Sequence, residues 1–367
     1  MLDAAWRPEG DRGFCVPNAT TYPWQWLWDS CFHAIVWARL GDARAVLELT
    51  SALADQDDDG FVPHLRYVGG GPHEDFWGRA GTSSITQPPM YGHALAELHR
   101  RGVDLPAALV GRAWSGLRFL LTVRPRTTGG LVELCHPWES GCDDSPRWDA
   151  VLDGPWTPVA WHEAKGELVR SLDRTPSGGA LHNPRFAIGS VGFSALVAWN
   201  ALELATVAPD GDLEARAREL ADAVDARWDP ALRTWVDDGP TAATSGRVRT
   251  LDALLPLLVR PRPDAFAELD DETAFAAACG PRGVRRDEPA YASTTYWRGP
   301  AWPQLGYLLW VATTRSSSSQ LAAALSRSIT TGVWTSGFAE YWEPDTGAGL
   351  GAIPQSWSTL ACVVRER

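Results

Sequence analysis

The amino-acid sequence predicts an all-α fold, an (α/α)6 toroid in which six helical hairpins form inner and outer rings. Apolar residues recur at the i, i+3, i+4 and i+7 spacing of amphipathic helices along most of the 367 residues. Segments rich in valine and isoleucine do not alternate regularly with these helices, which argues against doubly wound and TIM-barrel folds. Helix–loop–helix units recur at a nearly constant spacing, so we expect a closed ring whose polar, aromatic loops collect at one end.

The expected helices are separated by clusters of glycine, proline and aspartate. Residues 31–56 read as two helices that break at Gly41 and Asp42. Further helices are expected over residues 85–102, 107–124, 190–208, 211–228, 248–260, 273–280, 303–314 and 319–334, with a last one over 356–367. Because no linker divides these segments, we expect residues 1–367 to form a single domain.

Composition and charge exclude several classes of partner. The formal net charge of -12 argues against a nucleic-acid partner, since phosphate binding needs a basic face. No stretch of about 18 apolar residues is present, so we expect no membrane partner. The first residues lack a signal-peptide pattern, and the six cysteines contain no CxxC pair. We therefore expect reduced thiols and a cytoplasmic protein; the sequence does not indicate an oligomeric state.

One segment resembles a calcium loop without completing it. Residues 55–60, DQDDDG, match the first half of an EF-hand, but position twelve is Arg66 instead of a bidentate glutamate. We interpret the segment as a capped turn, and we expect neither a metal nor another cofactor.

The chain contains 20 tryptophans, many of them in short clusters beside carboxylates and amides. Most tryptophans in any protein belong to the core, but indole faces also stack on the C–H faces of sugars. Three such clusters stand out, at residues 21–33, 136–149 and 337–357. They point towards a carbohydrate ligand.

Each cluster carries candidate chemistry. Asp29 precedes an apolar helix, so an N-cap is an equally good interpretation of it. The second cluster, HPWESGCDDSPRWD, holds four carboxylates, which raise one another's pKa as a general acid requires. The third places Glu340 beside aromatic residues before a glycine-rich turn. Two separated carboxylates among aromatics are the arrangement that glycoside hydrolysis uses.

These segments resemble a known family. The motifs WLWDSCF, PHL, SSITQPP, WESGCDDSPRWD, NPRF, YWRGPAWPQLGYLLW and FAEYWEPDTGAGLGA...SW are similar to those of the mannosylglycerate and glucosylglycerate hydrolases of glycoside hydrolase family 63. They occur in order from about Tyr22 to Trp357, nearly the whole chain. The resemblance implies an (α/α)6 catalytic domain and an inverting mechanism on a small α-glucoside or α-mannoside, with glucosylglycerate and mannosylglycerate as candidates.

The resemblance also implies roles for individual residues. Asp143, which closes WESGCD, corresponds to the general acid, and Glu340 of FAEY corresponds to the general base. Arg185 of NPRF is the candidate clamp for a glycerate carboxylate, because a planar guanidinium suits bidentate binding. The other implied substrate-binding residues, with the last three on the aglycone side, are Tyr22, Trp26, Trp28, Asp29, His64, Gln87, Trp138, Tyr296, Trp297 and Trp302.

One departure keeps other functions open. The family pattern after the base is usually Tyr-Tyr-Asn-Pro, whereas Glu343 here replaces the asparagine and adds a carboxylate, which would either raise the pKa of Glu340 or disfavour an anionic aglycone. An α-glucosidase or trehalase-like hydrolase of neutral disaccharides would keep Asp143 and Glu340 but would not need Arg185. A catalytically silent sugar-binding toroid would keep the tryptophans and tolerate the loss of either carboxylate. The sequence leaves glucose and mannose equally open.

Overall fold

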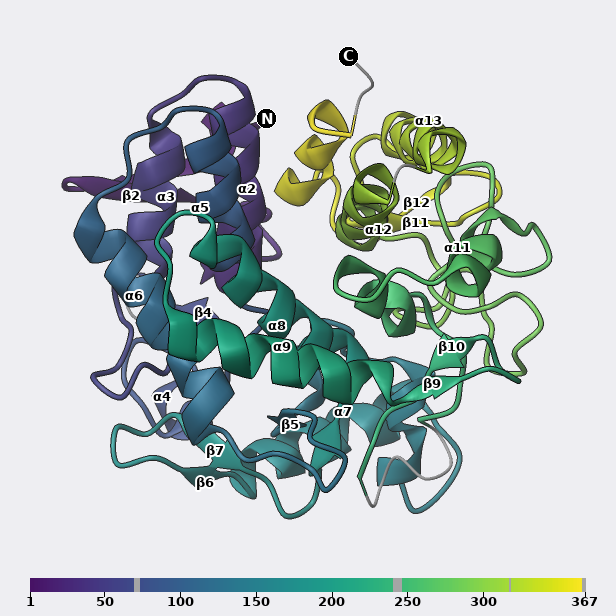
Figure 1. Cartoon of the computed structure of the whole chain (residues 1–367), viewed down its shortest axis with the longest axis horizontal. Coiled ribbons are helices and arrows are strands. Elements are labelled where there is room, and N and C mark those ends of the chain that lie inside the picture. The colour runs from purple at the N-terminus through teal and green to yellow at the C-terminus, as the bar shows by residue number, and fades with distance from the viewer. Residues whose placement is uncertain (69–72, 240–245, 317, 365–367) are drawn as a thin grey trace.

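The computed structural model describes residues 1–68, 73–239, 246–316 and 318–364, and it is mostly helical (Figure 1). The longer helices are α2 (Leu27–Arg39), α3 (Arg44–Ala52), α5 (Tyr91–Arg100), α6 (Ala107–Arg118), α7 (Pro158–Arg170), α8 (Val191–Ala205), α9 (Gly211–Asp225), α11 (Pro263–Asp270), α12 (Pro303–Arg315) and α13 (Ser319–Thr335). Shorter helical segments are α1 (Leu2–Ala5), α4 (Glu74–Trp77), η1 (Phe119–Val123), η2 (Pro137–Ser140), η3 (Pro146–Val151), η4 (Leu251–Leu258) and η5 (Ser356–Cys362).

The strands are short and form antiparallel pairs. The pairs are β1 (Trp6–Glu9) with β2 (Arg12–Cys15), β3 (Gln25–Trp26) with β4 (Leu65–Arg66), β5 (Glu133–Leu134) with β8 (Ile188–Gly189), β6 (Asp173–Arg174) with β7 (Ala180–His182), β9 (Trp228–Asp229) with β10 (Thr234–Trp235), and β11 (Tyr341–Trp342) with β12 (Gly349–Leu350). Two of these pairs position candidate site residues, because Trp26 ends β3 and Glu340 directly precedes β11.

The helices pack in a closed order of contacts. α2 contacts α5, α5 contacts α8, α8 contacts η4, η4 contacts α12, α12 contacts η5, and η5 returns to α2. A second helix covers several of these from outside: α3 lies on α2, α6 on α5, α9 on α8, α11 on η4 and α13 on α12 (Figure 1). The N-terminal and C-terminal parts of the described chain are therefore neighbours across α2 and η5.

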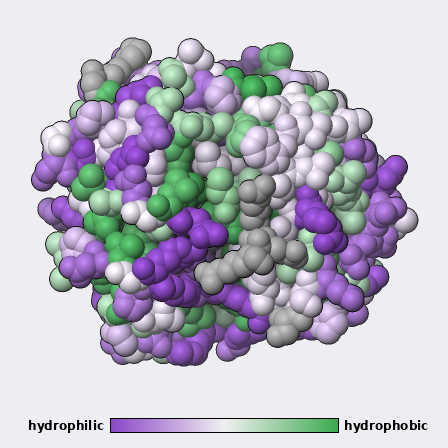
Figure 2. Space-filling model, turned by 90° about the horizontal axis from the view of Figure 1, so that it is seen from above, coloured by the Kyte–Doolittle hydropathy of each residue, from purple (hydrophilic) through white to green (hydrophobic). Residues whose placement is uncertain are grey.

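Burial explains which helices lie inside. α8 is apolar around most of its circumference and nearly all of its residues are buried, as expected of a helix covered on every side. Its partner α9 buries one stripe, formed by Leu213, Ala217, Leu220, Ala221 and Val224, and exposes its charged residues. Hydrophilic and hydrophobic side chains are interspersed on the face drawn in Figure 2.

Most of the predicted helices are confirmed, with two kinds of difference. Residues 273–280 form turns, because the carbonyl groups of Glu272 and Ala276 accept hydrogen bonds from the buried Arg282. The segments at 248–260 and 356–367 contain the 3-10 helices η4 and η5, and Pro256 interrupts the first of them. Residues 365–367 lie outside the described part. The helices α7 and α11 were not predicted.

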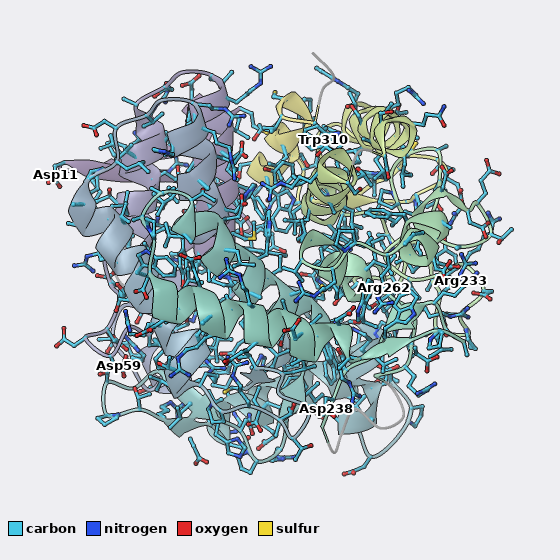
Figure 3. All side chains as sticks on the ribbon, in the orientation of Figure 1. Asp11, Asp59, Arg233, Asp238, Arg262 and Trp310 are labelled. Atoms are coloured by element: carbon cyan, nitrogen blue, oxygen red, sulfur yellow. The ribbon has the colours of Figure 1, made fainter. Side chains whose placement is uncertain are left out.

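The DQDDDG segment is a turn whose carboxylates have protein partners. Asp55 pairs with Arg66, the residue at position twelve, and Asp57 pairs with Arg79 at 2.7 Å. Asp59 accepts a hydrogen bond from the backbone of Phe61 at 3.0 Å, and it lies at the periphery of the molecule (Figure 3). The six cysteines, all within the described residues, are free thiols. In the described part of the chain, no helix combines the length and apolarity needed to cross a bilayer.

Buried ion pairs hold the segment 136–149, which contains only the short helices η2 and η3. Arg124 binds both carboxylate oxygens of Glu139, at 2.8 and 3.0 Å, with both side chains fully buried. At the other end, the buried Arg147 binds Asp237 at 2.8 Å and also Asp252. The segment is thereby anchored to Asp252 in η4 and to Asp237, which accepts a hydrogen bond from the backbone of Val191 at the start of α8.

We expect Arg147→Met to lower the free energy of unfolding by about 3–5 kcal/mol, because it leaves Asp237 and Asp252 buried without their cation. Urea unfolding of the purified protein measures this. The matched control is Arg218→Met, which removes an exposed i, i+4 pair with Glu214 and should change stability by about 0.5 kcal/mol or less. Equal effects of the two variants would show that the buried pairs do not hold the segment.

Candidate active site

A cavity with an empty volume of about 440 Å³ collects residues from all three tryptophan-rich clusters. Its lining residues are Pro17, Tyr22, Trp26, Trp28, Asp29, Gln87, Gly141, Asp143, Tyr296, Trp297, Glu340, Gln355 and Trp357. Asp143 and Glu340 are 197 positions apart in sequence and both face this cavity. The cavity is therefore a candidate active site.

Glu340 is held by backbone and side-chain contacts. Its Oε2 accepts a hydrogen bond from the backbone of Ala352 at 2.9 Å, and its Oε1 accepts one from the hydroxyl of Tyr22 at 3.1 Å. The indole of Trp357 donates to its backbone carbonyl at 3.0 Å. Burial raises the pKa of Glu340 above its usual value, while the two donors to its carboxylate work against that rise. The residue is 3% exposed, so its orientation is fixed.

Asp143 has a pKa raised above the usual value of an aspartate, as a general acid needs. Burial raises its pKa to about 7; the cation of Lys165 opposes that rise and the neighbouring Asp144 adds to it. Its Oδ2 accepts a hydrogen bond from the hydroxyl of Tyr296 at 3.3 Å. The crowding of carboxylates predicted from sequence contributes only in part, because Glu139 is neutralised by Arg124. Desolvation is the main cause.

Two glycines allow the close approaches in this cavity. Gly141 has a φ of +73°, and a Cβ there would lie 2.5 Å from the ring of Trp28. Gly351 has a φ of +69°, and a Cβ there would lie 2.4 Å from Oε2 of Glu340. Both backbone conformations favour glycine. The glycines of the WESG and GLG segments are thus explained by the packing around each carboxylate.

Several buried polar atoms on the cavity wall have no hydrogen-bond partner among the described residues. They are Asp29 Oδ1, Trp26 Nε1, Trp297 Nε1 and Gln355 Oε1. Buried polar groups in proteins are nearly always hydrogen-bonded, so these four unpaired atoms leave the cavity-lining residues with hydrogen-bonding capacity that a polar ligand can use. A sugar has both the hydroxyls and the apolar C–H faces that such a wall can bind.

Asp29 differs from its N-cap interpretation. It lies in the first turn of α2, whose N-cap is Trp26, and its side chain is buried. Burial, and then the charge of Glu340, raise the pKa of Asp29 well above its usual value. A carboxyl group in this state has a free oxygen for a ligand hydroxyl.

An aromatic stack forms one side of the cavity. Trp297 and Trp302 lie parallel with ring centroids 3.7 Å apart, and Trp302 stacks on Tyr341 at 4.5 Å. Trp297 has a φ of +58°, an uncommon conformation for a bulky residue. Its packing against Trp302 holds the indole at the cavity surface.

The structure brings together most of the predicted site residues. Those that line the cavity are Asp143, Glu340, Tyr22, Trp26, Trp28, Asp29, Gln87, Tyr296 and Trp297. Trp302, His64, Trp138 and Arg185 do not. Trp302 supports Trp297 from behind, as the stack shows.

His64 lies behind the cavity wall, and Trp138 is not among the residues that line the cavity. The His64 ring packs edge-on against Trp26, with centroids 5.3 Å apart, and its Nδ1 lies 2.6 Å from Ser83 Oγ. Burial lowers the pKa of His64 to about 3, so this ring is neutral. Trp138 packs on Trp77 at 5.9 Å. His64 therefore supports the wall through Trp26 instead of forming its surface.

The prediction that Arg185 faces the pocket is wrong. Its side chain is 58% exposed, and its nearest acidic partner is Glu167 of α7, at 3.9 Å. The adjacent Asn183 is buried and donates hydrogen bonds to Cys135 and Leu168, so the chain turns Arg185 outward.

Sequence reasoning missed four lining residues: Pro17, Gly141, Gln355 and Trp357. Gly141 and Trp357 lie within motifs that carry the family resemblance, so the resemblance could have indicated them. Gln355 stands beside the latter motif, and its unpaired amide oxygen becomes visible only in the fold. Pro17 carries no signal.

Two neighbouring carboxylates point elsewhere. Asp144 Oδ1 accepts hydrogen bonds from Lys165 at 2.5 Å and from Trp161 at 2.9 Å. Glu343 Oε2 accepts from the backbone of Thr346 at 2.7 Å and so closes the turn after β11. Neither lines the cavity.

A buried group outside the cavity has metal-type ligands. Cys15, His33 and Glu48 place their ligand atoms within 4.8 Å of one another. Glu48 already accepts hydrogen bonds from the Cys15 backbone at 3.0 Å, and the His33 ring contacts both Glu48 and Ser356. These contacts join α2, α3, β2 and η5, so we assign the group a structural role.

Comparison with known proteins agrees with the sequence resemblance. A family model described as the mannosylglycerate hydrolase MGH1-like glycoside hydrolase domain matches residues 22–358. A mannosylglycerate hydrolase from Thermus thermophilus is 28% identical over 403 residues, which cover 96% of this chain and 97% of that protein. A glucosylglycerate hydrolase from Mycolicibacterium hassiacum is 30% identical over 413 residues, covering 93% and 91%.

A solved structure is similar along its whole length. The crystal structure of a family 63 mannosylglycerate hydrolase from Thermus thermophilus, in complex with Tris and D-glycerate, has a TM-score of 0.83. The sequences are 27% identical, and the match covers 98% of this chain and 97% of that one.

We expect Tyr22→Phe to raise the pKa of Glu340, because the lost hydroxyl donates to the carboxylate and favours its ionised form. Carbon-13 NMR titration of labelled glutamate measures this, with Glu340→Gln identifying the signal. Tyr67→Phe is the control, since that hydroxyl contacts Trp77 instead. A pKa that stays the same or falls in Tyr22→Phe would contradict the assigned role of the hydrogen bond.

Proposed function

The chain belongs to the mannosylglycerate hydrolase MGH1-like glycoside hydrolases, and on this basis we propose that Asp143 and Glu340 perform inverting hydrolysis in its cavity. It is a glycoside hydrolase that acts on a small α-glucoside or α-mannoside. The observation that carries the assignment is the meeting of these two carboxylates, from distant segments, in one aromatic cavity with unpaired polar atoms.

The proposed reaction uses one proton donor and one proton acceptor. Asp143 donates its proton to the glycosidic oxygen while the bond from that oxygen to the anomeric carbon breaks, which releases the aglycone as an alcohol. Glu340 removes a proton from a water molecule whose oxygen bonds to the anomeric carbon from the opposite face. The product has the inverted configuration, and proton exchange with solvent restores both carboxyl groups. Inversion requires a carboxylate separation of about 6.5–9.5 Å, which leaves room for the water.

We further propose that Asp29, Gln87, Trp26 and Trp28 bind the glycone. Asp29 and Gln87 would accept or donate hydrogen bonds with its hydroxyls, and Trp26 and Trp28 would contact its C–H faces. Tyr296 and Trp297 lie beside the acid, where the leaving aglycone must be, so we assign them to the aglycone side.

The aglycone has two candidate chemistries. Glucosylglycerate and mannosylglycerate are supported by the relatives, one of which has been crystallised with D-glycerate. A neutral aglycone is favoured by the charge of the cavity. Its described lining includes three carboxylates and no cationic side chain, and Arg185 points away from it.

We also infer the finer architecture and location. The closed order of contacts α2–α5–α8–η4–α12–η5, with outer partners on five of its members, supports an (α/α)6 toroid that forms one catalytic domain over residues 1–367. The free cysteines fit a reducing compartment, so we propose a cytoplasmic enzyme.

Asp143→Asn and Glu340→Gln are each expected to lower kcat about 10²–10⁴-fold, because each removes a proton-transfer group. Glu343→Gln is the matched control: it changes a carboxylate near the base that faces Thr346, and it should keep most of the activity. Proton NMR of the first sugar formed by the wild-type enzyme reports the anomer. Retained configuration would exclude inversion, and full activity of either active-site variant would exclude that residue's role.

A substrate screen distinguishes the two aglycone chemistries. Released sugar is measured with glucosylglycerate, mannosylglycerate and neutral α-disaccharides. We expect Arg185→Ala to leave turnover of whichever substrate is cleaved unchanged, because the side chain lies on the surface. A selective loss of glycerate-glycoside turnover in Arg185→Ala would instead mean that this arginine reaches the substrate.

A further inference from the structure

Lys165 is the only lysine of the chain, and it lies next to the candidate acid. Its Nζ is 2.5 Å from Oδ1 of Asp144, the residue that follows Asp143. Both side chains of this ion pair are largely buried. The indoles of Trp138 and Trp161 lie within cation–π range of Nζ, at 5.7 and 5.9 Å to the ring centroids.

One face of α7 binds the segment that carries the candidate acid. Trp161 and Lys165 are four positions apart, so they lie on the same side of this helix. The Trp161 indole donates to Asp144 Oδ1 at 2.9 Å and to the backbone carbonyl of Asp143 at 3.2 Å. In addition, Nε2 of His136 lies 3.0 Å from the backbone carbonyl of Lys165. The helix thus holds both the start of the segment and the Asp143–Asp144 dipeptide.

We propose that Lys165 and Asp144 form a positioning ion pair that directs Asp143 into the cavity and tunes it as the acid. Asp144 is turned towards α7 by Lys165 and Trp161, whereas the preceding residue, Asp143, lines the cavity. The inference rests on the proposed role of Asp143.

The two members of the pair act on Asp143 in opposite directions. The Lys165 cation lowers the pKa of Asp143, and the Asp144 anion raises it. The effects of Lys165 and Asp144 on the pKa of Asp143 oppose each other. With the ion pair intact, burial is therefore the dominant influence on that pKa. The other ionisable groups that interact with Asp143 are Tyr296 from the segment before α12, Glu340 from the segment before β11, Tyr22 from the segment before β3, and the adjacent thiol of Cys142.

The opposed signs separate tuning from mere support. A residue that only supports the fold would affect activity in the same direction in either single variant. A charge pair beside Asp143 instead predicts that Lys165→Met and Asp144→Asn shift the pKa of Asp143 in opposite directions. In the double variant the two pKa shifts should partly cancel.

The test measures the pKa of Asp143 in the free enzyme by carbon-13 NMR titration of labelled aspartate, with Asp143→Asn identifying the signal. Lys165→Met should raise the pKa of Asp143 by about one unit, and Asp144→Asn should lower it by about one unit, because a nearby charge shifts a carboxyl pKa by about that much. The double variant and Lys165→Arg should lie near the wild type. In kcat/KM on glucosylglycerate or mannosylglycerate, whichever is cleaved, the basic limb should move with the acid: upward in Lys165→Met and downward in Asp144→Asn.

The proposal would be overturned if Lys165→Met and Asp144→Asn shifted the pKa of Asp143 in the same direction, or if neither variant shifted it. Circular dichroism and thermal unfolding establish that each variant is folded. If Lys165→Met does not fold, Asp144→Asn alone decides, because a pKa of Asp143 at or above the wild-type value contradicts the tuning role. Full activity of Asp143→Asn would refute the proposed acid but would leave the NMR shifts as a separate result, so the two failures are distinguishable.

Discussion

Buried ion pairs are the constraint on which the site depends. The segment 136–149 carries the candidate acid, yet it contains only two short 3-10 helices. Arg124 with Glu139, Lys165 with Asp144, and Arg298 with Asp149 hold it along its length, and Arg147 anchors its end to Asp237 and Asp252. Removing charges from water is costly, so these pairs persist only because each is matched by a partner in good geometry. They replace the backbone hydrogen bonds that a regular element would supply.

The same segment shows how a helical scaffold produces a cavity. Inner helices such as α2 supply rigid positions for Trp28 and Asp29, while Asp143 and Glu340 come from loops between helices. Glycines at positions 141 and 351 let those loops approach Trp28 and Glu340 at distances that a Cβ would forbid. The aromatic residues then exclude water, and the resulting desolvation raises the pKa of Asp143 to about 7.

The sequence was informative where a local pattern decides the outcome. The helices α2, α8 and α12 are long and rich in apolar residues, most of which are buried, so these helices could be predicted. Residues 273–280 have similar apolar content, but the buried Arg282 just after them binds the backbone carbonyls of Glu272 and Ala276, and apolar periodicity does not report that contact. The helix α7 was not predicted, although Thr157 and Pro158 provide an N-cap and a first-turn proline.

The site could also be predicted only in part, because sequence motifs are local patterns. Ordered motifs brought nine residues to the cavity wall, but adjacency in a motif does not say which side chain reaches the surface. Trp302 and His64 stand behind their neighbours Trp297 and Trp26, and Arg185 turns outward beside the buried Asn183. The place of Lys165 beside Asp144 could not be predicted either, because it depends on the helix α7, which was not predicted.

The hydroxyl of Tyr296 has a consequence for the chemical step itself. It donates to Oδ2 of Asp143 at 3.3 Å, and a hydrogen bond to an ionised acceptor is stronger than one to a neutral acceptor. As Asp143 gives up its proton, this bond gains strength while the substrate is still changing. An interaction that is weak before reaction and strong during it lowers the activation barrier without tightening the hold on the resting substrate. In the proposed mechanism, the tyrosine would thus contribute to turnover more than to affinity.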